Sequence, residues 1–214
     1  MAVQVLIGTT NPSKVRRFEE LLKGYNLNFL TLRDLHIEDE PKETGNTPEE
    51  NAVLKARFYG TYFDRVICND SGLYLDGLAL DDERQPGLNI RSPRGKRLDD
   101  EEMIEYYASL AHSLGGKVPA CYLDGIAVYN QGVVMSFMED RDNVEDNAFY
   151  LVDQVSEKRH PGWPLDSISL DRSTGISFVD EDDGQNESEE DHIMVGEYAK
   201  KLTAFLAKAL GLEG

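Results

Sequence analysis

The sequence of 214 residues predicts a mixed α/β fold, in which helices flank a partly antiparallel sheet. Strand-like and helix-like segments alternate in the first half, which is typical of β–α–β units. β-Branched and aromatic residues then dominate residues 118–136 and 148–155, which is typical of hairpins. The length fits one domain, or one domain split into two lobes around a cleft. We expect residues 1–214 to form a single domain.

The first elements are a strand at residues 3–7, a loop at residues 8–14 and a helix that Gly24 closes. The apolar residues of this helix recur at helical spacing: Val15, Phe18, Leu21 and Leu22. A second strand is predicted at residues 26–32.

A helix start follows at Thr47, with Thr47 as the cap, Pro48 at the first helical position and Glu50 capping back. We expect this helix to reach about residue 62. The short apolar run at residues 66–68 reads as a strand.

Asp99 or Asp100 caps the third predicted helix, which Gly115 ends. Its apolar face is formed by Met103, Ile104, Tyr107, Leu110 and Leu114. A last helix is predicted at residues 195–210, with Tyr198, Leu202, Phe205 and Leu206 facing inward.

The composition argues against several classes of protein. A formal charge of −18 disfavours nonspecific binding to nucleic acid or to an anionic membrane. Cys68 and Cys121 form neither a CxxC motif nor a Cys/His cluster, so we expect no disulfide framework or zinc site. We expect a cytoplasmic protein, because no long apolar stretch or signal-like start is present. Eight acids within residues 180–191 predict a solvated loop.

Three polar stretches are candidates for chemistry, and the first is Thr-Thr-Asn-Pro-Ser-Lys at residues 9–14. A helix N-terminus offers free N–H groups to phosphate, and Thr9, Thr10, Asn11 and Lys14 would add side-chain donors. The P-loop pattern GxxxxGK[ST] is absent. The alternative is an ordinary capped helix with a solvated Lys14.

The second stretch covers residues 43–57. Asn51 and Lys55 share one helical face with Thr47, and Glu43 lies in the loop that leads into the helix. Such a polar stripe suits the wall of a cleft. Surface salt bridging is the alternative.

The third stretch, Asn69-Asp70-Ser71-Gly72, follows the apolar strand. Turn chemistry explains most such clusters. In the alternative interpretation, Asp70 ends the strand at the mouth of a cleft and holds a metal or takes a proton. With Glu43 nearby, two carboxylates could bind Mg²⁺, which bridges polyphosphate oxygens and acidifies water.

In this order and spacing, the three stretches resemble the inosine triphosphate pyrophosphatase family, which hydrolyses non-standard nucleoside triphosphates. The family's T-x-N-x-x-K matches residues 9–14, and its E-T-G-x-[ST]-x-x-E-N-A-x-x-K-A matches residues 43–56. Its D-D-S-G-L matches residues 69–73, with Asn69 in place of the first aspartate, and a Pro-Gly follows at residues 86–87.

The resemblance implies an elongated two-lobed fold with a substrate cleft between the lobes, a Mg²⁺ requirement and a homodimer. It implies hydrolysis of inosine or xanthosine triphosphate to a monophosphate and pyrophosphate. Glu43 and Asp70 would hold the metal, and Asp70 and Lys55 would be catalytic, with Asp70 as the base for water. The implied phosphate-binding residues are Thr9, Thr10, Asn11, Lys14, Lys55 and Ser71.

The second half departs from the family. Residues 162–166 match the family's F-G-Y-D-P only in part. By this match Trp163 would stack on the base and Asp166 would also bind it. The alternative for Trp163 is an anchor in the hydrophobic core. Ile-Met-Val at residues 193–195 replaces the family's Ser-His-Arg, which predicts altered base specificity. Residues 158–160, Lys-Arg-His, would supply donors or form a solvated basic turn.

Two other functions stay open from the sequence. One is a catalytically weak nucleotide-binding protein that kept the phosphate half of the site and lost the base-reading half. The other is a pyrophosphatase for a different nucleotide. The presence of Asp70, Glu43, Lys14 and Lys55 together favours an enzyme.

Overall fold

The computed structural model describes residues 2–138, 148–160, 162–180 and 196–212. The predicted acidic loop, apart from Asp180, and the Ile-Met-Val segment therefore lie outside the described residues. None of the described helices is long and apolar enough to cross a bilayer.

The predicted mixed sheet is confirmed. Within the described ranges, seven strands form one sheet in the order β2-β1-β3-β4-β6-β7, with β5 also paired to β4. The parallel part pairs β1 with β2 and β3; the bounds are β1 (Val3–Ile7), β2 (Leu27–Thr31) and β3 (Arg65–Leu75). The antiparallel part pairs β4 with β5 and β6, and β6 with β7; the bounds are β4 (Lys117–Asn130), β5 (Val133–Met138), β6 (Ala148–Val152) and β7 (Ser169–Asp171).

The chain forms two compact units. Unit 1 comprises residues 1–71, 124–140 and 190–214, and unit 2 comprises residues 72–123 and 141–189. Strands β3 and β4 each contribute to both units.

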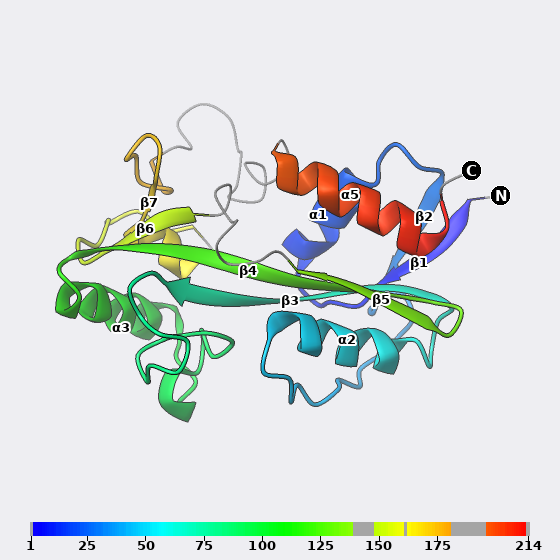
Figure 1. The fold of residues 1–214 in the computed structure, drawn as a ribbon, viewed down its shortest axis with the longest axis horizontal. Helices are drawn as coiled ribbons and strands as arrows, with labels where there is room; N and C mark the ends of the chain where they lie inside the picture. Colours follow the sequence, from blue (N-terminus) through cyan, green and yellow to red (C-terminus); the bar gives the residue numbers. More distant parts are fainter. Residues whose placement is uncertain (1, 139–147, 161, 181–195, 213–214) are drawn as a thin grey trace. The chain divides into compact units, whose positions relative to one another are not determined.

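Unit 1 has three layers. Helices α1 (Pro12–Leu21) and α5 (Glu197–Leu210) cover one face of its strands, and α2 (Pro48–Tyr59) covers the other (Figure 1). Alternate strand residues point to opposite faces, so Ile7 joins the core under α1 and α5 while Leu6 joins the core under α2. The inward residues predicted for the last helix lie in this first core, although Phe205 is only partly buried.

Unit 2 is built around α3 (Asp100–Ser113), which packs on β3, β4 and β6. Asp99 is the cap, and it forms a complete capping box with Glu102. The predicted apolar face is confirmed: Met103, Ile104, Tyr107 and Leu110 are buried, and Leu114 packs against them partly buried.

The helix start at Thr47 is confirmed in part. The Thr47 hydroxyl accepts a hydrogen bond from the N–H of Glu50 at 3.1 Å. The Glu50 carboxylate, however, accepts from the N–H of Asn46 at 2.6 Å rather than capping back onto Thr47. The helix ends at Tyr59, three residues before the predicted end, and α1 ends at Leu21 rather than at Gly24.

The predicted end of the third strand is wrong, and so is the turn at residues 69–72. Strand β3 continues unbroken to Leu75. The chain stays extended because its polar side chains find partners on both faces of the sheet. Asp70 bonds to α2 on one face, and Ser71 bonds to Asp124 on the other.

Candidate active site

Asp70 lies in the middle of β3 with its carboxylate toward α2. Its Oδ2 accepts a hydrogen bond from Asn51 Nδ2 at 2.8 Å. Asn51 is only 3% exposed, and its Oδ1 accepts from the N–H of Gly45 at 2.8 Å. A Cβ on Gly45 would lie 2.7 Å from that Oδ1, so the close approach requires glycine. Asn51 thereby ties the Glu-Thr-Gly loop to Asp70.

Lys55 stands one turn after Asn51 and contacts both predicted metal ligands. Its Nζ lies 2.6 Å from Glu43 Oε1 and 3.4 Å from Asp70 Oδ1. Burial alone would lower the pKa of Lys55, but the carboxylates of Asp70 and Glu43 outweigh burial and raise it. Lys55 is therefore a stable cation between two carboxylates.

Lys14 reaches the same strand from α1. Its Nζ donates to Ser71 Oγ at 3.3 Å. Burial lowers the pKa of Lys14 below its ordinary value of 10.5, and the negative charges of Asp124 and Asp70 oppose this only in part. The structure thus brings both predicted phosphate-binding lysines to consecutive residues of β3.

The loop before α1 uses part of its polar side chains on itself. Thr9 Oγ1 accepts from the N–H of Asn11 at 3.2 Å, and Asn11 Oδ1 caps the helix by accepting from the N–H of Ser13 at 2.9 Å. Thr10 is exposed. Pro12 has no N–H, and the N–H of Val15 donates to the Asn11 carbonyl at 3.3 Å. Among the first-turn donors the cap therefore leaves the N–H of Lys14 to a ligand, so an anion at this helix start would depend mainly on the Lys14 side chain.

The predicted base-binding residues belong to unit 2. Asp166 is 7% exposed, and its Oδ2 lies 2.8 Å from His160 Nδ1. Burial raises the pKa of Asp166, which the contact with His160 partly offsets. Trp163 is partly exposed and precedes the short helix η3 (Pro164–Ile168), so it is not a buried core anchor.

The three basic residues before Trp163, at positions 158–160, pair with acids that differ in their exposure. Lys158 pairs with Asp180 at 2.9 Å and Arg159 pairs with Glu101 at 3.0 Å, both at exposed positions. His160 contacts the buried carboxylate of Asp166.

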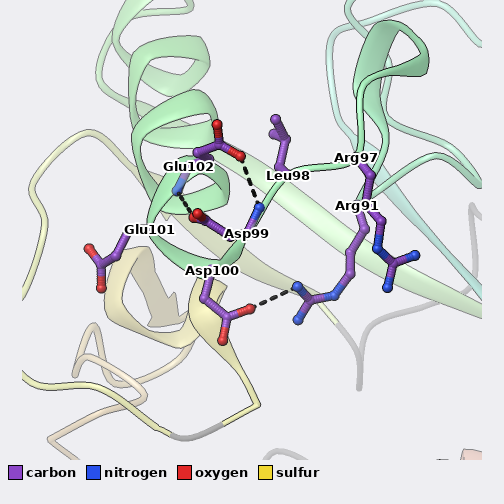
Figure 2. Close-up of a pocket in the computed structure, with 7 residues that line it drawn as sticks. All are labelled: Arg91, Arg97, Leu98, Asp99, Asp100, Glu101 and Glu102. Carbon is purple, nitrogen blue, oxygen red and sulfur yellow. Dashed lines mark hydrogen bonds and ion pairs between the residues drawn. The ribbon is translucent and has the colours of Figure 1, made fainter.

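A surface hollow in unit 2 contains none of the predicted site residues (Figure 2). Its lining residues are Arg91, Arg97, Leu98, Asp99, Asp100, Glu101 and Glu102. The dashed contacts in Figure 2 show that several of its charges serve α3: Asp99 and Glu102 cap the helix, and Arg91 pairs with Asp100 at 2.7 Å.

Sequence reasoning missed a buried ion pair beside Lys14. Arg17 Nη1 donates to Asp124 Oδ2 at 2.5 Å, with side chains 5% and 8% exposed. The two residues are 107 positions apart, so spacing could not have paired them. A single acid inside the apolar residues of β4 was the one available signal. Asn51 was recognised as part of a polar stripe, but its role as a partner of Asp70 was not.

Two lysines, two carboxylates and a capped helix start within one α/β unit can bind an anion that carries several phosphate groups. The fold and these side chains define an α/β protein with a candidate anion-binding site. The family follows from sequence comparison: residues 5–141 match the Ham1 family, and the chain belongs to that family. The resemblance drawn from the motifs is thereby confirmed.

Curated relatives carry the name dITP/XTP pyrophosphatase. That of Thermoanaerobacter pseudethanolicus is 39% identical over 87 residues, which cover 40% of this chain and 42% of the relative. That of Bacillus subtilis is 35% identical over 103 residues, which cover 48% and 50%. The matched stretch thus spans half or less of the length of these relatives.

Solved structures agree over most of the chain. The Staphylococcus aureus Ham1 protein aligns with a TM-score of 0.66 and 22% identity, covering 96% of this chain and 98% of its own. A HAM1 protein from Coxiella burnetii aligns with a TM-score of 0.70 and 19% identity, covering 97% and 100%. At these identities the likeness confirms the fold.

Proposed function

We propose that this protein is a Mg²⁺-dependent nucleoside triphosphate pyrophosphohydrolase. It would convert non-standard purine triphosphates of the inosine and xanthosine type to the monophosphate and pyrophosphate. The observation that carries the proposal is the convergence of Glu43, Lys55 and Asp70 from three segments, next to the Lys14–Ser71 contact. Membership of the Ham1 family and the names of the curated relatives support it.

The residues divide the reaction between them. The triphosphate would be bound by Lys14, Lys55, Ser71 and the loop of Thr9, Thr10 and Asn11. Each charge-assisted hydrogen bond would contribute about 1.5–3 kcal/mol to the binding free energy. Asp70 would take a proton from the attacking water. As the water oxygen bonds to the α phosphorus, the bond from that phosphorus to the oxygen bridging the α and β phosphates breaks, and pyrophosphate leaves with this oxygen. Lys55 would offset the charge that develops on the phosphate oxygens.

The donor set around Lys55 fits Mg²⁺. Glu43 and Asp70 both offer oxygen and already surround one cation, the Lys55 ammonium. No cluster of three or more His, Cys, Asp or Glu side chains is found among the residues described. Mg²⁺ is commonly held by one or two carboxylates together with substrate phosphates and water, so two are sufficient. When bound, the ion would supply positive charge to the phosphate oxygens.

Trp163 and Asp166 are proposed to bind the base, with Trp163 stacking on it. Because Ile-Met-Val replaces Ser-His-Arg at residues 193–195, and exposed acids engage Lys158 and Arg159, we expect few donors to a 6-keto purine. A site without such donors rejects analogues weakly. We therefore expect only a weak preference for inosine or xanthosine over the standard purines, or preference for another nucleotide.

The experiment that tests the proposed activity is pyrophosphate release from a panel of nucleoside triphosphates with and without Mg²⁺. We expect Mg²⁺-dependent release, with kcat/KM for inosine triphosphate less than about a hundredfold above that for adenosine or guanosine triphosphate. A larger preference would mean that other residues form a specific base site. If the protein binds a nucleoside triphosphate but releases pyrophosphate from none of the panel, it is a catalytically weak nucleotide-binding protein instead.

The two lysines should differ in their response to pH. Burial lowers the pKa of Lys14, whereas Asp70 and Glu43 raise that of Lys55, so Lys14 loses its proton first as the pH rises. The charges that act on Lys14 are those of Asp124, Lys55, Asp70 and Arg17. When Lys14 loses its proton, its positive charge is lost, so we expect the affinity for pyrophosphate to fall as the pH rises through the pKa of Lys14, which lies below 10.5.

Lys14→Arg tests this expectation, because arginine stays charged to above about pH 12. Isothermal titration with pyrophosphate from about pH 7 to about pH 10 should show that the variant loses the alkaline decline. Identical profiles for the variant and the wild type would show that another group titrates.

We propose three further properties. From its length, the chain of residues 1–214 would form one catalytic domain. The family resemblance supports a homodimer, and the cysteine content supports a cytoplasmic location. The formal charge of −18 supports the absence of nucleic-acid partners.

A further inference from the structure

A buried chain of polar contacts lies beneath the phosphate-binding lysine in unit 1. The Arg17–Asp124 pair uses one carboxylate oxygen of Asp124, Oδ2. The other oxygen, Oδ1, accepts a hydrogen bond from Ser71 Oγ at 2.6 Å. Ser71 in turn accepts from Lys14 at 3.3 Å. Asp124 is therefore two hydrogen bonds away from the Lys14 ammonium.

The direction of these hydrogen bonds fixes the Ser71 hydroxyl. A hydroxyl has one hydrogen and two lone pairs. Because Ser71 gives its hydrogen to Asp124, its lone pairs remain to accept from Lys14. Without an acceptor at residue 124, the Ser71 hydroxyl would be free to rotate, and its hydrogen could point toward the ammonium instead.

The charges support the same arrangement. Burial alone would raise the pKa of Asp124, but Arg17, Lys14 and the Ser71 hydroxyl together lower it, so Asp124 is ionised at neutral pH. Its negative charge is also the strongest influence opposing the loss of charge at Lys14. Arg17 holds this carboxylate from α1, the helix that also carries Lys14.

Stability alone does not account for the Arg17–Asp124 pair. Apolar residues of similar volume often replace a buried ion pair with no loss of stability. An apolar residue at position 124 could not, however, orient Ser71 or favour the charged form of Lys14.

We propose that Asp124 is a positioning residue for phosphate binding: it orients the Ser71 hydroxyl and the Lys14 ammonium, and Arg17 holds it in place. The inference rests on the proposed function only in that Lys14 is taken to bind phosphate.

The test compares three double variants. Arg17→Met with Asp124→Leu removes both charges and the acceptor while filling the space. Arg17→Gln with Asp124→Asn removes the charges but keeps an oxygen for Ser71. Glu20→Gln with Lys23→Gln removes an exposed ion pair from the same helix and serves as the control. The readouts are the Kd for inorganic pyrophosphate in Mg²⁺ buffer, KM and kcat for a triphosphate substrate, and Tm.

We expect the Arg17→Met, Asp124→Leu variant (the Met/Leu variant) to keep its Tm within a few degrees but to bind pyrophosphate about tenfold more weakly, with KM rising more than kcat falls. The Arg17→Gln, Asp124→Asn variant (the Gln/Asn variant) should recover part of the affinity for pyrophosphate. The control at Glu20 and Lys23 should match the wild type. A folded Met/Leu variant with wild-type Kd would overturn the inference. If that variant does not fold, the Gln/Asn variant decides: a weakened Kd supports the inference and a wild-type Kd overturns it.

The same titration separates this inference from the proposed function. A wild-type protein that binds pyrophosphate but releases none from any triphosphate would refute the enzyme, while the comparison of Kd values among the variants would still test Asp124. A wild-type protein that does not bind pyrophosphate would overturn both.

Discussion

Replacing Asp70 by asparagine is expected to lower kcat by on the order of a thousandfold or more while the protein stays folded. Asparagine has nearly the same shape, and its oxygen can still accept the hydrogen bond from Asn51 that Asp70 Oδ2 accepts at 2.8 Å. It cannot take a proton from water, and it is a far weaker ligand for Mg²⁺. It also removes one of the two carboxylates that surround Lys55.

Steady-state pyrophosphate release and a thermal melt together check this expectation. Asp34→Asn is the matched control, because Asp34 is an exposed acid of unit 1 whose hydrogen bonds within the described part of the chain go to the nearby Thr31. Turnover of the Asp70 variant within a few-fold of the wild type would refute the catalytic assignment.

Gly125→Ala is expected to cost about 3 kcal/mol or more in the free energy of unfolding, or to displace α2. A Cβ on Gly125 would lie 2.1 Å from the backbone nitrogen of Glu49 and 2.1 Å from the carbonyl carbon of Pro48. Because both are backbone atoms, no side-chain rotation relieves the clash. Helix α2 carries Asn51 and Lys55, so its displacement would also disturb the contacts of Asp70.

A fall in Tm of at least about 6 °C is the expected readout for a chain of this size. Gly24→Ala is the control, because nothing lies within 4 Å of its Cβ position. Loss of activity without loss of stability would show that α2 moved, whereas no change in either property would contradict the packing of β4 against the start of α2.

Local patterns predicted those parts of the fold whose causes are local. The cap at Thr47 and the apolar face of α3 follow from spacing within about one or two helical turns. A hairpin was predicted within residues 118–136 without a turn position, and the structure places its two-residue turn at Gln131 and Gly132, both with positive φ.

The course of β3 could not be predicted in this way. Polar residues after an apolar run have the composition of a turn, and only distant partners keep Asp70 and Ser71 extended within the strand. Distant hydrogen-bond partners do not explain why Asn69 lies inside the same strand. Asn69 is 3% exposed, and neither its Nδ2 nor its Oδ1 has a hydrogen-bond partner among the described residues.

The candidate site divides along similar lines. The family resemblance implied that Glu43, Lys55 and Asp70 share one site, and the structure brings these side chains into contact. Arg17 and Asp124 could not be found in this way, because no local pattern links a helix residue to a strand residue 107 positions later. Their pairing depends on how α1 packs on the sheet of unit 1.

The identity of the phosphorus products tests the central claim most directly. Inosine triphosphate is incubated with the protein and Mg²⁺, and the products are followed by ³¹P NMR alongside the Asp70→Asn variant. The proposed mechanism predicts inosine monophosphate and pyrophosphate in equal amounts, formed only by the protein that retains Asp70. Inosine diphosphate with inorganic phosphate, or equal turnover by the variant, would contradict it.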